Sequence, residues 1–214
     1  MSAGKGAEAV TVGCGVTRRG FLAALAGAVV AGACGTGAAT CVPTEDNPQG
    51  PFYVAGAPFR TDIAPGGEPG ERLAVGGRVL SAAGCRPLAD AVVEVWHANA
   101  AGAYYGLEGA TGEGAWQLRG RARTGKGGSY RFETILPGRY PLSPQRLRPR
   151  HIHYLVAAPG HRPVVTQLYV AGDPSLAGDP LVRPSLIMPV NAARKTGGAG
   201  APWSVVFDVT LAPR

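Results

Sequence analysis

The sequence predicts an all-β protein, built as a β-sandwich of mixed short strands. Glycine (33) and proline (19) supply about a quarter of the 214 residues, and this composition favours frequent turns over long helices. Apolar residues make up 45% of the chain, which is enough to form a buried core. Short β-branched runs recur after residue 72, whereas no stretch after residue 40 has the periodicity of an amphipathic helix.

The first 40 residues are predicted to be a Tat-type signal peptide followed by a short linker. The pair Arg18-Arg19 precedes an apolar run of about 14 residues, which is too short to span a membrane. Ala31-Gly32-Ala33 before Cys34 fits a cleavage site and favours soluble secretion. A lipid anchor on Cys34 and a short buried helix are the alternatives. Because Tat export carries folded proteins, often with their metal inserted, this signal is a first indication of a cofactor.

Residues 41–214 are expected to form a single domain. Of the four cysteines only Cys41 and Cys85 lie inside it, and an oxidising compartment permits a disulfide between them. Two free buried thiols are the alternative. Neither cysteine belongs to a C-x-x-C pair, which argues against a structural zinc site.

The elements of this domain follow one another in short runs. Residues 42–71 are rich in proline and glycine turn signals. Beyond them, Val93 and Val95 alternate with Val92 and Glu94, a period of two that indicates a half-buried strand. Strands are expected at residues 73–80, 91–98, 129–135, 151–158, 164–171 and 203–211, the last with the same alternation.

The basic residues argue against a nucleic-acid partner. The net charge is +7, with 18 arginines and three lysines against 14 acidic residues. The arginines are scattered along the chain and form no basic tract. We therefore expect no binding to nucleic acid.

His151-Ile152-His153 is the clearest local indication of a site. Residues two apart in a strand point to the same face, so both imidazoles can bind one metal ion. Pro149 disfavours a regular central strand just before the pair, which places the histidines at the start of a strand, beside a loop. Alone, an H-x-H pair is more often a surface feature than a site.

Tyrosines are the hard anionic donors available to complete such a site, because no Cys, Asp or Glu lies near the histidine pair in the sequence. Tyr104 and Tyr140 each end a glycine-containing segment next to a predicted strand. A phenol, whose free pKa is ~10, ionises at neutral pH beside a trivalent cation. Two phenolates and two neutral imidazoles suit Fe(III), although a lone tyrosine is more often an amphipathic rim residue.

With these residues the sequence resembles the intradiol ring-cleavage dioxygenases, in particular protocatechuate 3,4-dioxygenase and its smaller exported relatives. The resemblance covers roughly residues 41–211. Each motif is weak alone, but together and in order they make a strong match. The motifs are Gln49–Tyr53, Arg60–Ile63, Trp96–Tyr104, Gly128–Phe132, Pro137–Pro141, Arg148–His153, Thr166–Tyr169, Gly172–Pro174 and Phe207–Val209.

The resemblance implies a mononuclear non-haem Fe(III) cofactor and a role for each site residue. The four protein ligands would be Tyr104, Tyr140, His151 and His153. Tyr140 would leave when a catechol chelates the metal and would take a substrate proton. Arg148 would stabilise charge that develops on the ring, and Gln167 would help to orient substrate or oxygen.

The implied reaction is oxidative cleavage of a catechol ring by O₂ between its two hydroxylated carbons, giving a cis,cis-muconate-type diacid. Plain catechol, protocatechuate, hydroxyquinol and lignin-derived catechols all remain open as substrates. The chain lacks the long N-terminal helical region of the catechol 1,2-dioxygenase branch, which argues against the linker-type dimer of that branch. The oligomeric state is otherwise open.

Two details depart from a simple reading of the motifs. Tyr105 follows Tyr104 directly, so the ligand could be shifted by one residue. Arg148 and His151 have opposite parity along a strand, so both face the metal only if Pro149 interrupts the pleat.

Two other functions are considered. The strand and turn pattern also resembles transthyretin-like or carboxypeptidase-regulatory β-sandwich modules, which bind or space other domains without chemistry. Such a module has no reason to keep the two tyrosines and the histidine pair. A zinc hydrolase would need a third ligand and a general base, and neither Glu94 nor Glu133 lies in an H-E-x-x-H helix.

Overall fold

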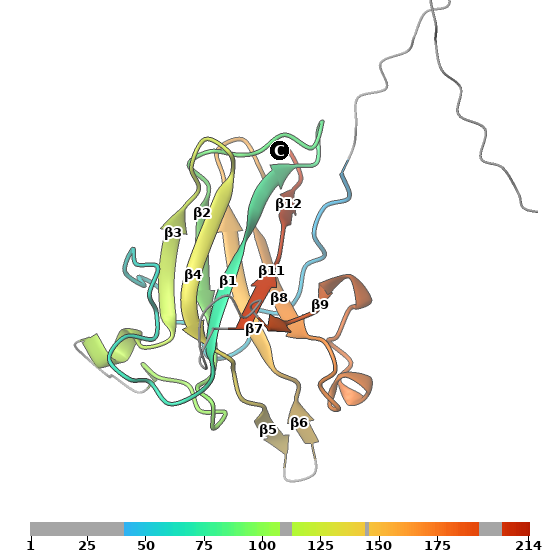
Figure 1. The fold of residues 1–214 in the computed structure, drawn as a ribbon. Coiled ribbons are helices and arrows are strands. Elements are labelled where there is room, and N and C mark those ends of the chain that lie inside the picture. The colour runs from blue at the N-terminus through green and yellow to red at the C-terminus, as the bar shows by residue number, and fades with distance from the viewer. Residues whose placement is uncertain (1–40, 108–112, 144–145, 193–202) are drawn as a thin grey trace, which may run out of the picture. The chain divides into compact units, whose positions relative to one another are not determined.

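A computed structural model describes residues 41–107, 113–143, 146–192 and 203–214. Residues 37–214 group into one compact unit. The predicted signal peptide and Cys34 lie outside the described residues. The described part is all-β, as predicted, with two facing sheets and one hairpin (Figure 1).

The first sheet is built around a long strand, β1 (Arg72–Ser81). β4 (Ser129–Ile135) pairs with it in antiparallel register, while two short strands run parallel to successive halves of its other side. These are β11 (Trp203–Val206) and β12 (Val209–Leu211), and β10 (Asn191–Ala192) extends the edge beyond β11.

The second sheet carries the predicted histidine strand near its centre. Its order is β3-β2-β7-β8-β9, with antiparallel pairs except for the parallel pair of β8 and β9. A separate hairpin of β5 and β6 projects from one end of the sandwich (Figure 1). The bounds are β2 (Val92–Trp96), β3 (Arg119–Arg123), β5 (Tyr140–Ser143), β6 (Arg146–Arg148), β7 (His151–Ala157), β8 (Val164–Val170) and β9 (Ile187–Met188).

The core lies between the two sheets. Val75 and Phe132 from the first sheet and Val93, Ile152 and Leu168 from the second are all at most 2% exposed and share one cluster. Helical structure in the described residues is limited to three short 3₁₀ turns, η1 (Glu113–Trp116), η2 (Leu176–Gly178) and η3 (Pro184–Leu186).

The predicted alternation in β2 does not appear as alternating exposure. Val93 and Val95 face the core, but Trp96 on the opposite face is also buried. The reason is a second covering layer, because the ring of Tyr53 lies 4.9 Å from that of Trp96.

The predicted strand at 203–211 is two strands, β11 and β12. Its alternation holds, since Phe207 is buried and Val206 is exposed. The interruption arises where the backbone of Phe207 packs closely on Gly77, and the Asp208 carboxylate accepts a hydrogen bond from the Arg78 N–H at 2.8 Å. A side chain at Gly77 would overlap the Phe207 carbonyl, so glycine is required there.

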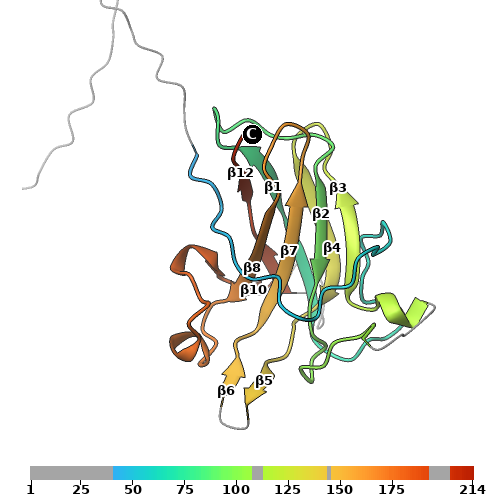
Figure 2. The ribbon, with the colours of Figure 1, turned by 180° about the vertical axis from the view of Figure 1, so that it is seen from behind.

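Residues 41–53 form a segment that we call the N-terminal strap. It begins at a disulfide between Cys41 and Cys85, which confirms the predicted pairing. Figure 2 shows the strap running beside β8 and then across the end of the second sheet. Asn47 N–H donates to the carbonyl of Val165 at 2.8 Å along this path. The strap thus connects the disulfide end of the sandwich with the end that carries the histidine pair.

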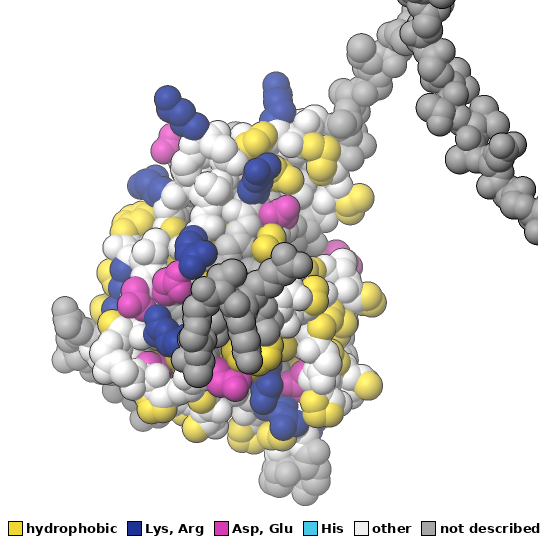
Figure 3. Space-filling model, viewed as in Figure 1, with side chains coloured by type: hydrophobic (Ala, Val, Ile, Leu, Met, Phe, Trp, Pro, Cys, Tyr) yellow, Lys and Arg dark blue, Asp and Glu magenta, His cyan; other side chains and the backbone are white. Residues whose placement is uncertain are grey.

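Charged side chains are spread over the one face of the molecule that Figure 3 shows. On the face shown in Figure 3, Lys and Arg side chains lie among Asp and Glu and do not gather into one patch.

Candidate metal centre

The four predicted ligand residues come together at one end of the second sheet. His151 and His153 are the first and third residues of β7, and their Nε2 atoms face each other at 3.2 Å. Tyr140 begins β5, with its ring centroid 5.5 Å from that of His151. Tyr104 lies in the loop after β2, 5.6 Å from Tyr140 and 6.3 Å from His153 by the same measure.

The loop that presents Tyr104 is fixed by close backbone packing against the segment before β5. Asn99 Oδ1 accepts hydrogen bonds from the N–H groups of Ala101 and Ala103, at 3.0 and 2.9 Å. Gly102 has a φ of 87° and lies directly against the carbonyl of Arg139, which leaves no room for a side chain. The two tyrosines are therefore held by two segments that pack on each other.

The donor atoms of this cluster are buried and incompletely paired. His151 Nδ1 lies 2.6 Å from the Pro149 carbonyl and so donates to it, which leaves the Nε2 lone pair directed at the cluster. Tyr104 is half-buried as a residue, but its hydroxyl is inaccessible and has no hydrogen-bond partner. His153 Nδ1 also lacks a partner. Buried polar atoms without partners are costly, and a metal ion bound by the cluster would remove that cost at the hydroxyl.

The protonation states also suit a metal. Burial, and then the charge of Arg148, lowers the pKa of His151 to about 4. Burial lowers the pKa of His153 well below 6.5, and both imidazoles are therefore neutral at pH 7. Burial, and then Tyr140, raises the pKa of Tyr104 above its usual value of ~10. The phenol thus ionises only beside a strong positive charge, which a hard trivalent cation supplies.

Arg148 reaches this cluster because the strand is broken, as the parity argument required. β6 ends at Arg148 and β7 begins at His151, with Pro149 and Arg150 between them. Arg148 pairs across the hairpin with Tyr140 and donates from Nη1 to its hydroxyl at 3.3 Å.

Gln167 lies behind this arginine. Its Oε1 accepts from Arg148 Nη2 at 2.8 Å, and its Nε2 donates to the Pro48 carbonyl of the strap at 2.7 Å. The predicted catalytic residues and ligands therefore form one connected group.

A family model described as Dioxygenase matches residues 49–213. The chain belongs to the intradiol dioxygenase family. Among curated relatives, catechol 1,2-dioxygenase 2 of Acinetobacter lwoffii is 40% identical over 147 residues, covering 61% of this chain and 52% of that protein. The protocatechuate 3,4-dioxygenase beta chain of Burkholderia cepacia is 46% identical over 123 residues, covering 54% and 52%. The chain spans about half the length of these relatives.

Solved structures of intradiol dioxygenases are similar as well. The dioxygenase domain of a dioxygenase carbohydrate-binding protein fusion from Streptomyces sp. SirexAA-E has a TM-score of 0.65 and 35% identity. That match covers 81% of this chain and 100% of the other. 3-Chlorocatechol 1,2-dioxygenase from Rhodococcus opacus 1CP has a TM-score of 0.72 and 25% identity, covering 80% and 73%.

The two neighbouring tyrosines of this family member point to different surroundings. The Tyr105 hydroxyl donates to Glu68 at 3.2 Å and accepts from Asn99 Nδ2 at 3.4 Å. The Tyr104 ring instead stacks on Phe52 at 4.2 Å and lies near Tyr140. The geometry therefore favours the unshifted register.

The sequence analysis assigned no role to several residues that surround the two tyrosines and two histidines. Phe52 of the strap covers both tyrosines, and Trp96 stacks parallel to His153 at 4.9 Å. Tyr169 donates to Gln167 Oε1 at 2.9 Å, and Asp179 pairs with Arg148. The alternation of Gln167 and Tyr169 on β8 was a usable signal for the tyrosine. Asp179 lies in a loop, directly after η2, and no pattern in the sequence indicated its contact with Arg148.

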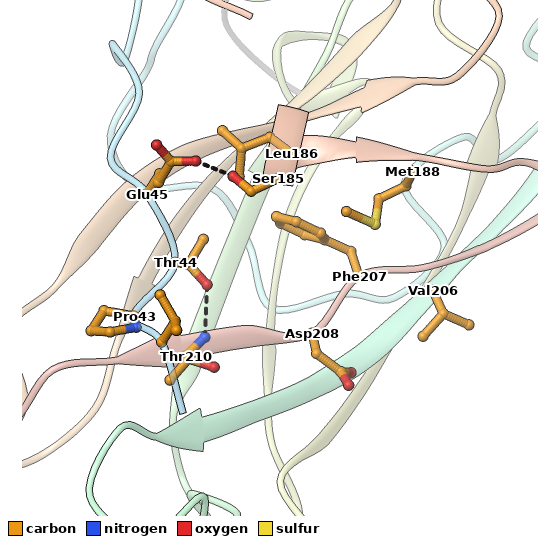
Figure 4. A pocket seen from close by; sticks show the side chains of 11 residues that line it. Pro43, Thr44, Glu45, Ser185, Leu186, Met188, Val206, Phe207, Asp208 and Thr210 are labelled. Carbon is orange, nitrogen blue, oxygen red and sulfur yellow. Dashed lines mark hydrogen bonds between the residues drawn. The ribbon is translucent and has the colours of Figure 1, made fainter. Parts of the chain in front are cut away.

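One groove of the described structure lies away from this cluster. It has a volume of about 470 Å³ and opens between the strap, η3 and the β11–β12 edge, with Thr44, Leu186 and Phe207 in its lining (Figure 4). It contains none of the predicted site residues.

Among the described residues, no group of three or more His, Cys, Asp or Glu side chains is arranged to hold a metal, whereas the candidate site consists of two histidines and two tyrosines. Within the same residues no helix has the length and apolarity to cross a membrane.

Proposed function

We propose that this intradiol dioxygenase-family protein cleaves the ring of a catechol between its two hydroxylated carbons, using O₂ and mononuclear non-haem Fe(III). The product is a cis,cis-muconate-type diacid that keeps both oxygen atoms of O₂. One observation carries the proposal: the unpaired, buried hydroxyl of Tyr104 faces the same cluster as Tyr140 and the histidine Nε2 atoms. The names of the relatives support the same substrate class.

The proposed ligands are Tyr104, Tyr140, His151 and His153. Bound there, ferric iron would act as a Lewis acid that keeps the phenols ionised and prepares a bound catecholate for reaction with O₂. The neutral imidazoles leave the phenolates to balance part of its charge.

The remaining steps belong to the side chains. Tyr140 would serve both as a ligand and as a base, because its Oη would accept a proton from a substrate hydroxyl when a catechol takes its place. Arg148, fixed 3.3 Å from that oxygen, offers a buried positive charge to the negative charge that develops on the ring. Gln167 accepts at Oε1 from Arg148 and Tyr169 and donates from Nε2 to the Pro48 carbonyl, so it would contribute to orientation chiefly by holding the arginine.

The proposal is tested by metal analysis, a visible spectrum and an O₂-uptake panel across substituted catechols, with identification of the product. We expect one iron per chain, a red-brown colour from tyrosinate-to-Fe(III) charge transfer, and a ring-opened diacid. A colourless protein without iron would indicate a non-catalytic module. Stoichiometric zinc would indicate a hydrolase. The panel also identifies the preferred catechol.

Variants of the histidine pair test the ligand set. His151→Ala or His153→Ala should lose most of the iron, since each removes one of four donors. His161→Ala is the matched control, because His161 lies outside the cluster and bonds Ser81 Oγ at 3.0 Å. If the His151→Ala/His153→Ala double variant still held stoichiometric Fe(III) and cleaved catechols, the ligand set would be wrong.

A further inference from the structure

Arg148 forms a buried ion pair with Asp179. The two side chains are 6% and 3% exposed, and Arg148 Nε donates directly to Asp179 Oδ2. Removing two charged groups from water costs free energy, and their mutual attraction offsets that cost only when the geometry is well defined. None of the roles assigned so far uses this carboxylate.

The ion pair fixes the orientation of the guanidinium plane. Nε is held by Asp179, and Nη2 donates to Gln167 Oε1 at 2.8 Å and to the Tyr169 hydroxyl at 3.1 Å. With two edges of the planar group engaged, Nη1 has a single orientation, toward Tyr140 Oη at 3.3 Å. Asp179 thereby determines which nitrogen faces the cluster.

Asp179 is itself held in place. Its Oδ1 accepts from the Leu181 N–H at 2.9 Å, so the carboxylate cannot rotate freely. The carbonyl of Leu181 in turn accepts from Asn47 Nδ2 of the strap at 2.7 Å. Asn47 Oδ1 lies 3.2 Å from the Tyr169 hydroxyl oxygen, whose single hydrogen is donated to Gln167 Oε1 at 2.9 Å.

We propose that Asp179 is a positioning residue that acts through Arg148, by fixing the guanidinium so that Nη1 faces the hydroxyl of Tyr140 and the substrate. This inference rests on the proposed function. Asp179 does not touch the metal ligands through any described hydrogen bond, and its effect is therefore on turnover rather than on iron.

A second aspartate in the same loop offers a matched comparison. Asp173 is 1% exposed, and its Oδ1 accepts from the Ser175 N–H at 2.8 Å, as Asp179 does from Leu181. Its arginine neighbours are Arg139 and Arg150, at 4.0 and 3.9 Å, and not Arg148. Asp173→Asn thus reproduces the loss of a buried charge in this loop without touching the catalytic arginine.

The test is a double-mutant cycle of Asp179→Asn with Arg148→Ala, measured as kcat, KM, iron content and the tyrosinate band. Asparagine keeps the acceptor for Leu181 and removes the charge that holds Nε. We expect Asp179→Asn to lower kcat by about 10–100-fold with iron, colour and KM nearly retained. In the Arg148→Ala background the same change should have no further effect on kcat. Asp173→Asn should change kcat by the same factor in both backgrounds.

Tyr169→Phe is the second variant, in case Asp179→Asn does not fold. It removes one hydrogen bond to Nη2, and its smaller decrease in kcat should also vanish with Arg148→Ala. Equal decreases of kcat in both backgrounds, or loss of iron and of the band, would overturn the positioning role. A wild-type protein that cleaves no catechol would refute the proposed function instead, which separates the two failures.

Discussion

Tyr104 and Tyr105 are adjacent in the chain, yet the structure gives their hydroxyl groups opposite surroundings. Tyr105 has two polar partners, Asn99 and Glu68, whereas Tyr104 has none. A buried phenol without a partner is destabilising unless something else binds its oxygen. The sequence left open whether Tyr104 or Tyr105 is the ligand, and this difference allows variants of the two residues to be compared.

Tyr104→Phe should bleach or shift the charge-transfer band and weaken iron binding, because it removes one phenolate donor. Tyr105→Phe is the matched control and should leave the band unchanged, at a stability cost of about 1 kcal/mol for a lost partly buried hydrogen bond. Visible absorption and iron analysis of the two purified variants decide between them. Bleaching by Tyr105→Phe alone would shift the ligand by one residue.

Some site residues could be predicted from the sequence and others could not. The histidine pair could be predicted because the two-residue period of a strand puts both rings on one face, and His151 and His153 do lie together. Asp179 could not be predicted, because it meets Arg148 from a loop 31 residues later, and no local period encodes that contact.

At the scale of elements, the predicted strands were those with β-branched runs. β1, β2, β4, β7 and β8 lie within or close to their predicted ranges. β3 was missed because its sequence, RGRAR, contains no β-branched residue. It is a strand because it pairs with β2 along five residues and because Ala122 enters the core. Tertiary pairing outweighs local propensity there.

The packing of the Tyr104 loop on the segment before Tyr140 gives a prediction at this scale. Gly102→Ala would place a methyl group against the Arg139 carbonyl at a positive φ, and so should push the two tyrosine-bearing segments apart. Gly160→Ala is the control, because Gly160 has a φ of 72° and open space around it. We expect the control to cost about 1–2 kcal/mol of unfolding free energy through backbone strain alone.

Gly102→Ala should destabilise more than this control and should also lose iron. Thermal unfolding and iron content measure the two effects separately. If both variants lowered the melting temperature equally and both kept iron, the close approach at Gly102 would have no part in holding the site.

At the scale of the whole molecule, buried neutral histidines make stability depend on pH. Burial lowers the pKa of His97 to about 4, and His97 donates from Nδ1 to the Ala98 carbonyl at 2.8 Å. The unfolded chain takes up protons near pH 6.5, while the folded protein does so only near pH 4. Between these values the unfolded state binds more protons, so stability falls as the pH falls.

We therefore expect the iron-free protein to lose stability from pH 6.5 toward pH 4. Each such histidine contributes a slope of at most about 1.4 kcal/mol per pH unit. His97→Gln should reduce the slope of the unfolding free energy against pH by the contribution of one buried histidine. Urea unfolding across this pH range measures it. A free energy of unfolding that is flat or rises on acidification would contradict the buried, neutral state.

The disulfide connects the stability of the fold with the predicted export of the protein. Cys41 and Cys85 are bonded with a Cα–Cα distance of 5.3 Å, and they close a loop of 44 residues that contains the strap. In the chain-entropy model a loop of that length stabilises the fold by about 4 kcal/mol. Such bonds form and persist in oxidising compartments and are rare in the cytosol. The strap places Phe52 and Asn47 beside the candidate metal centre, so one experiment can test both the disulfide that holds the strap and the predicted export.

Arg18→Lys/Arg19→Lys should trap a precursor in the cytoplasm, because the twin-arginine pair is the expected export signal. Non-reducing digestion and mass spectrometry should then find Cys41 and Cys85 as free thiols in the trapped precursor, and as one linked peptide pair in the exported wild-type protein. The trapped protein should also unfold at a lower temperature, since it lacks the closed loop. Secretion of the Lys-Lys variant at the wild-type level would refute the export signal. A linked pair in the trapped precursor would show that the disulfide forms without export.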